Sequence, residues 1–156
     1  MCKIYKLIGR FSALERPARG LFLRAYLLLP LISVSLSWRG FRKTKALLQY
    51  FLSASHGSQN PEAQARAALT AQMVRSAGRY GIGHRSCLEI SLALWWLLAR
   101  QGISSDLRVG IRKDGGKFEA HAWVECAGAA LNETETNQHH FAAFDSALAS
   151  LPPEPR

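Results

Sequence analysis

The chain has 156 residues and a mass of 17.3 kDa; 48% of its residues are hydrophobic and 20% are charged. This size and composition fit one globular domain with a single core, and they exclude a disordered, collagen-like or solenoid protein. The three cysteines, Cys2, Cys87 and Cys126, form neither an even disulfide set nor a Cys-x-x-Cys pair, which indicates free thiols in a reducing compartment.

The net charge of +9 is unevenly distributed along the chain. Residues 1–80 contain 13 Lys and Arg against two acidic residues, whereas residues 81–156 contain 7 basic and 9 acidic residues. We therefore predict a basic, apolar helical region over residues 1–60 and a core over residues 61–156, together forming one compact unit. Nucleic acid is not an expected partner, because no zinc ligand set, RNA-binding aromatic motif or helix-turn-helix signature accompanies the basic residues.

The basic region contains the most apolar stretch of the chain, Ala25–Trp38. Its 14 residues are fewer than the roughly 20 that cross a bilayer, and Pro30 would kink a helix within it. A second apolar and basic run follows Arg39, so two amphipathic helices are predicted rather than one membrane span. These helices would pack on the core with their basic face in solvent, or would bind a partner or a membrane surface. No cleavable signal peptide is evident, and a cytoplasmic location is expected.

The strongest local signal is Ser86-Cys87-Leu88-Glu89. Ser86 and Glu89 have the spacing of a capping box, which predicts a helix that begins at Cys87 and ends before Gly102. A preceding helix is expected over Pro61–Val74. A cysteine at the start of a buried helix lies next to unpaired backbone amides, which stabilise a thiolate. Cys87 is therefore a candidate nucleophile, and the alternative is a small buried core residue.

Alternating residues after this helix predict strands over Asp106–Arg112 and Phe118–Cys126, and a third over Ala129–Glu133. His121 would share one face of its strand with Trp123 and Glu125, and the opposite face would carry Ala122, Val124 and Cys126. Their order along the chain suits a thiolate–imidazolium pair of Cys87 and His121, if the helix packs its amino end on that strand.

Two residues could orient the His121 ring, namely Asn132 and Glu133. A simple two-residue turn at Ala127-Gly128 would place Asn132 on the His121 face, whereas a bulge near Gly128 would place Glu133 there. The pattern of residues leaves both open.

The remaining histidines and cysteines are read as structural or incidental. Cys126 should be a packing residue, and Cys2 should be exposed. The other histidines, which are expected to form ordinary hydrogen bonds, are His56, His84, His139 and His140. No metal or cofactor is predicted, because Cys87, His121 and Cys126 lack ligand spacing.

The pairing of C-L-x-x-S-L-A-L with A-H-A-W-V-E, within HRSCLEISLALWWLLARQGISSDLRVGIRKDGGKFEAHAWVE, resembles the transglutaminase-like core of the leader peptidases of lasso peptide biosynthesis. These are the B-type maturation proteins in their split, stand-alone form. The resemblance extends from about Arg19 to Asp145. It implies an α+β fold, with a helical amino-terminal half before a papain-like core in which a cysteine-bearing helix packs on an antiparallel sheet.

The same resemblance implies Cys87 as nucleophile and His121 as base, and it favours Glu133 as orienter, since the family usually has an aspartate at that position. It also implies three partners: a precursor peptide, a separate leader-recognition protein and an ATP-dependent cyclase. The recognition protein is expected to be separate because this chain is too short to include that domain as well. The reaction would be removal of a leader peptide by a cysteine endopeptidase with a Cys-His-acid triad; acyl transfer to an amine would use the same residues. The alternative is a non-catalytic module of a peptide-maturation complex that docks on a partner or a membrane.

Overall fold

The computed structural model describes residues 16–52, 60–81, 85–114, 117–132 and 142–143. Within them lie the helices α2 (Arg16–Tyr50), α3 (Pro61–Tyr80) and α4 (Cys87–Arg100). The strands are β1 (Asp106–Asp114), β2 (Lys117–Cys126), β3 (Ala129–Ala130) and β4 (Ala142–Ala143), which form an antiparallel sheet in the order β3-β2-β1-β4. The fold belongs to the α+β class.

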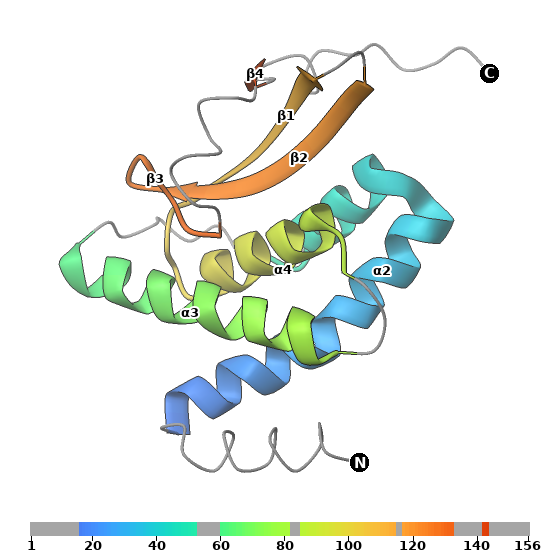
Figure 1. Cartoon of the computed structure of the whole chain (residues 1–156). Helices are drawn as coiled ribbons and strands as arrows, with labels where there is room; N and C mark the ends of the chain where they lie inside the picture. The colour runs from blue at the N-terminus through green and yellow to red at the C-terminus, as the bar shows by residue number, and fades with distance from the viewer. Residues whose placement is uncertain (1–15, 53–59, 82–84, 115–116, 133–141, 144–156) are drawn as a thin grey trace.

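Helix α4 lies at the centre of the molecule. The helices α2 and α3 pack on it, and strands β1 and β2 lie over its other side (Figure 1). Its apolar residues are distributed nearly all round, which explains why it is enclosed from several directions. Leu92, Leu94 and Leu98 are fully buried in one hydrophobic core that also contains side chains of α2, α3 and β2.

The ends of α3 and α4 follow local signals in the sequence. Asn60 caps α3 by accepting a hydrogen bond from the amide of Ala63 (2.8 Å), and Pro61 occupies its first turn. After α4 the backbone of Gly102 takes a positive φ of 68°, as predicted for a residue just past a helix end. Helix α3 continues to Tyr80, six residues beyond the predicted end at Val74.

Helix α2 is broken at Gly40 rather than at Pro30. The backbone of Gly40 has φ 72° and ψ 175°, a conformation that residues with a Cβ avoid. A second helical segment after Arg39 is therefore confirmed, and the break falls at Gly40 instead of the kink expected at Pro30 (Figure 1). The 14-residue apolar stretch that was expected to be too short to cross a membrane lies within this longer helix. By length and composition α2 could cross one, with a mean hydropathy of 1.6 over an 18-residue window of which 22% is buried.

The first two predicted strands are confirmed, and the third is shorter in the structure than predicted. β1 and β2 pair over their whole length, from Asp106 opposite Glu125 to Asp114 opposite Lys117. β3 contains Ala129 and Ala130 only, so the predicted strand Ala129–Glu133 is too long. β4, which pairs with the outer edge of β1, was not predicted.

Candidate active site

Cys87 begins α4, and a capping box fixes the backbone around it. The Ser86 hydroxyl accepts a hydrogen bond from the amide of Glu89 (3.3 Å), and the Glu89 carboxylate accepts one from the amide of Ser86 (2.7 Å). Both bonds of the predicted capping box are present. The half-buried Cys87 side chain thus lies in the first turn, where backbone amides have no partner inside the helix.

Arg85 is a charged neighbour of this cysteine that the sequence analysis missed. Its side chain is 10% exposed, and its Nη1 lies 3.8 Å from a carboxylate oxygen of Glu89. The Nε of Arg85 is buried and has no hydrogen-bond partner among the residues that the structure describes. A guanidinium next to the amino end of α4 adds positive charge where a thiolate would form, and it compensates the Glu89 carboxylate. The signal that could have revealed it is the basic residue two positions before Cys87.

Ser91 links α4 to β2 by hydrogen bonds. Its buried hydroxyl donates a hydrogen bond to the carbonyl oxygen of Ala122 (2.8 Å) and accepts one from Nδ2 of Asn132 (2.8 Å). Oδ1 of Asn132 in turn accepts a hydrogen bond from the amide of Val124 (2.8 Å). The helix and the strand are therefore joined by a continuous network of three hydrogen bonds.

This network brings the backbone of His121 level with the start of α4, while its side chain shares a face of β2 with Trp123, opposite the face from which Val124 and Cys126 enter the core. Ser91 lies four residues after Cys87, so the two share a helix face and are separated by about 6 Å along the axis. Helix α4 and β2 run in the same direction, because α4 leads through Ile103 into β1, whose first residue pairs with Glu125. The point on β2 that is level with Cys87 therefore lies about 6 Å before Ala122. This distance corresponds to nearly two strand residues, so His121 lies within it.

His121 lies on β2 among residues that support its ring. The ring is partly buried and stacks on the ring of Trp123, with a centroid distance of 6.2 Å and an interplanar angle of 15°. Nε1 of Trp123 donates a hydrogen bond to Glu125 (2.8 Å), which also accepts one from Arg108 (3.1 Å). The predicted face of His121, Trp123 and Glu125 is confirmed. The support that Trp123 gives to the ring was not foreseen.

The turn that follows β2 corrects one expectation about the third site residue. Ala127 and Gly128 have φ angles of 51° and 79°, and Cys126 pairs directly with Ala129 across them. This is the simple two-residue turn, so the alternative turn with a bulge near Gly128 is not formed. Strand pairing then ends after Ala130, and strand alternation does not determine the directions of Asn132 and Glu133.

Asn132 is hydrogen-bonded to both β2 and α4. Glu133 lies outside the described residues. The amide of Asn132 is engaged by Val124 and Ser91, as described above. Its side chain therefore links the chain after β3 to both β2 and α4.

The remaining predicted residues fall into two groups. Cys126 is 4% exposed and lies in the core, as predicted, and burial raises the pKa of its thiol above the ordinary value. Among the described residues no group of three or more His, Cys, Asp and Glu side chains could hold a metal ion. Outside the described residues lie Cys2, His56, His84, His139 and His140.

A cysteine that begins a buried helix, with a histidine on the strand against which this helix packs, is an arrangement used by thiol-dependent acyl-transfer enzymes. The family model of the transglutaminase-like superfamily matches residues 28–145, about three quarters of the chain. The chain therefore belongs to the transglutaminase-like superfamily, which often includes cysteine peptidases. No curated protein and no solved structure shows a significant match to it.

Proposed function

We propose that this protein is a cysteine peptidase that removes the leader peptide from a ribosomally made lasso peptide precursor. The observation that supports the peptidase most directly is the position of Cys87. It begins a capped helix, one turn before the serine that bonds to β2 beside His121. Superfamily membership supports the same class of chemistry.

The chemistry follows from these positions. The Cys87 thiolate attacks the carbonyl carbon of the scissile peptide bond and forms a tetrahedral intermediate. The backbone amide of Cys87, which has no partner within the helix, donates to the oxyanion. His121 then protonates the leaving amine, and the C–N bond breaks to give a thioester. Water activated by His121 hydrolyses this thioester and restores the thiol.

We assign the orienting role to Glu133 and a structural role to Asn132. Two hydrogen bonds to α4 and β2 already engage the Asn132 amide, which favours the next residue as the partner of the His121 ring. A carboxylate would stabilise the imidazolium by charge as well as by a hydrogen bond. The resemblance to the leader peptidases favours the same position.

The substrate and partners rest on that resemblance. The substrate would be a precursor peptide, which a separate leader-recognition protein delivers, and an ATP-dependent cyclase would close the ring. A genomic neighbourhood with a short precursor gene, a recognition-protein gene and an asparagine-synthetase-like gene would support this substrate. Transfer of the acyl group to an amine would need the same residues. Incorporation of ¹⁸O from labelled water into the released leader would identify hydrolysis.

The decisive experiment compares two cysteines in one assay. Cys87→Ala should abolish precursor cleavage, followed by mass spectrometry with the recognition protein present, and should leave the circular dichroism spectrum unchanged. Alanine keeps the helix start and removes only the sulfur. Cys126→Ala is the matched control and should still cleave. If Cys87→Ala cleaves as well as the unmodified protein, Cys87 is not the nucleophile; if the unmodified protein does not cleave at all, the chain is a docking module rather than a peptidase. Equal loss in both variants would also contradict the assignment of Cys87.

A further inference from the structure

The first segment of α2 is apolar on two opposite sides. Its inner side carries buried residues at alternating spacings of four and three, namely Ala18, Phe22, Ala25, Leu29 and Ile32. The outer side carries an equally regular set of exposed apolar residues, here called the outer stripe: Leu23, Leu27, Leu31, Val34 and Trp38. At about 100° per residue these two sets point in opposite directions. Trp38 is 86% exposed, so α2 presents a large apolar surface to the outside.

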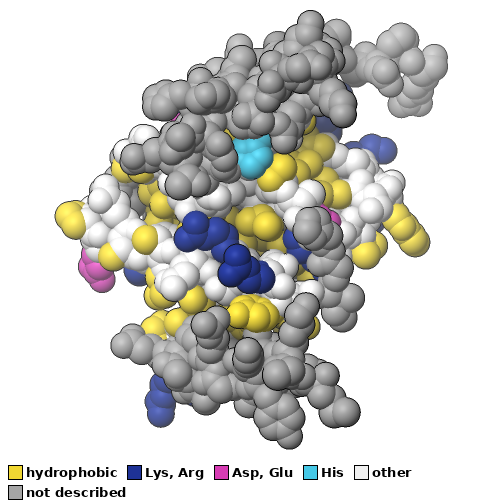
Figure 2. Space-filling model, viewed as in Figure 1, with side chains coloured by type: hydrophobic (Ala, Val, Ile, Leu, Met, Phe, Trp, Pro, Cys, Tyr) yellow, Lys and Arg dark blue, Asp and Glu magenta, His cyan; other side chains and the backbone are white. Residues whose placement is uncertain are grey.

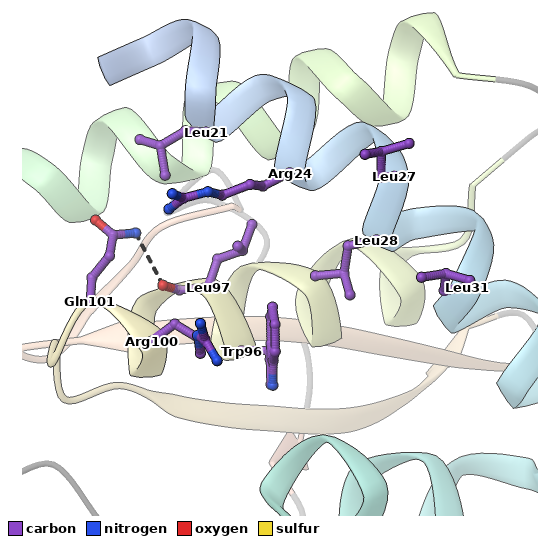
Figure 3. A pocket seen from close by; sticks show the side chains of 9 residues that line it. All are labelled: Leu21, Arg24, Leu27, Leu28, Leu31, Trp96, Leu97, Arg100 and Gln101. Atoms are coloured by element: carbon purple, nitrogen blue, oxygen red, sulfur yellow. Dashed lines mark hydrogen bonds between the residues drawn. The ribbon is translucent and has the colours of Figure 1, made fainter. Parts of the chain in front are cut away.

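A groove between α2 and α4 extends this surface. Two cavities of about 430 and 380 Å³ adjoin each other, because Leu28, Leu31, Trp96 and Arg100 line both. In Figure 3 the leucines of α2 lie along one side of the first cavity, and Trp96 and Arg100 of α4 lie along the other. The Arg100 guanidinium lies over the Trp96 ring at 5.3 Å, and Arg24 also lines this cavity. The groove is thus apolar with two cationic groups at its rim.

The charged residues of α2 itself all have one sign. Helix α2 contains seven basic residues and no acidic one. Arg16, Arg19 and Arg24 lie toward its start, and Arg39, Arg42, Lys43 and Lys45 follow Trp38. On the face of the whole molecule shown in Figure 2, which has α3 and the sheet in front, Lys and Arg side chains also lie among hydrophobic ones and acidic side chains are few. An apolar stripe bordered by cations at both ends complements the acyl chains and phosphates of an anionic lipid surface.

The packing of α2 favours a position on a membrane rather than across it. A spanning helix would have to leave α3 and α4, and this would expose Phe22, Leu29 and Ile32 of the core. The break at Gly40 also turns the chain after the stripe. A helix lying in the plane of the interface keeps its inner side on the core and inserts only its outer side.

We propose that the outer stripe and the adjoining groove bind the surface of an anionic phospholipid bilayer. Helix α2 lies flat in the interface, with Leu27 and Leu31 among the acyl chains and Trp38 at headgroup level. Arg24 and Arg100 bind lipid phosphates at the rim of the groove. This docking does not depend on the proposed peptidase activity.

Flotation with vesicles tests the proposal on the full chain. The protein should float with vesicles of phosphatidylcholine and phosphatidylglycerol at a molar ratio of about 7:3, and much less with pure phosphatidylcholine. Leu27→Glu combined with Leu31→Glu should reduce partitioning more than about tenfold, because both side chains leave the apolar interface. The matched control, Ala65→Glu with Ala68→Glu, adds the same charge at exposed positions of α3 and should float almost as well.

Tryptophan fluorescence provides a second measurement that does not depend on the glutamate variants. Emission should shift to shorter wavelength on anionic vesicles, and Trp38→Phe should remove most of the shift. Absence of flotation would overturn the proposal, as would equal loss in both glutamate variants. Flotation with neutral and anionic vesicles alike that resists alkaline carbonate would indicate a spanning helix and also overturn it. Self-association that the stripe variant abolishes, without vesicle binding, would assign the surface to a second copy.

Discussion

The side chain of Asn132 accepts the hydrogen bond that the backbone of a longer β3 would have accepted from β2. The amide of Leu131 still bonds to the carbonyl of Val124 (2.9 Å), as in a regular hairpin. The amide of Val124, however, bonds to Oδ1 of Asn132. The strand pairing therefore ends on a side-chain amide that also reaches α4 through Ser91. One residue connects the sheet, the helix and the chain that follows.

This arrangement separates the expected effects of two neighbouring substitutions. Asn132→Ala leaves the amide of Val124 without its acceptor and removes one of the two hydrogen bonds of the Ser91 hydroxyl, so the free energy of unfolding should fall by about 1–3 kcal/mol in urea denaturation. Glu133→Gln should leave stability nearly unchanged, lower kcat/KM for cleavage and shift the acidic limb of the pH-rate profile. If Asn132→Ala instead keeps its stability and shifts that limb, Asn132 orients His121 and Glu133 does not.

Among the elements, the break in α2 depends on a glycine. Gly40 has a positive φ, and the space around the position of a Cβ is open, so the strain of a substitution there would come from the backbone alone. Gly20 has the same open surroundings, but it lies inside the helix with ordinary angles. The two glycines thus form a natural pair for comparison.

Gly40→Ala should lower the free energy of unfolding by about 1–3 kcal/mol, because the backbone conformation disfavours a Cβ. Gly20→Ala should raise it by up to about 1 kcal/mol, through the higher helix propensity of alanine. Thermal or urea denaturation measures both. Equal effects of the two substitutions would show that the break in α2 does not need a glycine.

How far the sequence predicts each element depends on the range of its contacts. The start of α4 is set by a few adjacent residues and was predictable, whereas the form of the turn at Ala127-Gly128 was one of two alternatives that the residues left open. β4 was not predictable, because it depends on pairing with β1 about 30 residues earlier. The face of Asn132 could not be read from strand alternation, since the strand stops two residues before it. The Cys87–His121 pair became a candidate for two reasons. The capping box places Cys87 at the start of a helix, and His121 follows it on a strand in the order that a thiolate–imidazolium pair needs.

At the scale of the whole molecule, the basic helical region and the core behind it share one set of buried side chains. Phe22, Leu29 and Ile32 of α2 pack in the same cluster as α3, α4 and β2. Burial of three such side chains contributes roughly 5–9 kcal/mol, which is comparable with the whole stability of a typical domain, about 5–15 kcal/mol.

A fragment of residues 61–156 should therefore fail to fold alone. Its circular dichroism should lack a cooperative thermal transition, and its NMR spectrum should show poor dispersion, under conditions in which the full chain gives both. A cooperatively folded fragment would show that residues 61–156 form an independent core.

The two apolar sides of α2 also matter during synthesis. Helix α2 leaves the ribosome before α3 and α4, so the partners of its inner side are missing until about 50 more residues have been made. At about 5–20 residues per second this interval lasts roughly 2–10 s. For that time a nascent helix with hydrophobic side chains on two faces is available to chaperones, to other nascent chains and to lipid. The rate of translation between α2 and α4 should therefore influence how much of the newly made protein reaches its folded form.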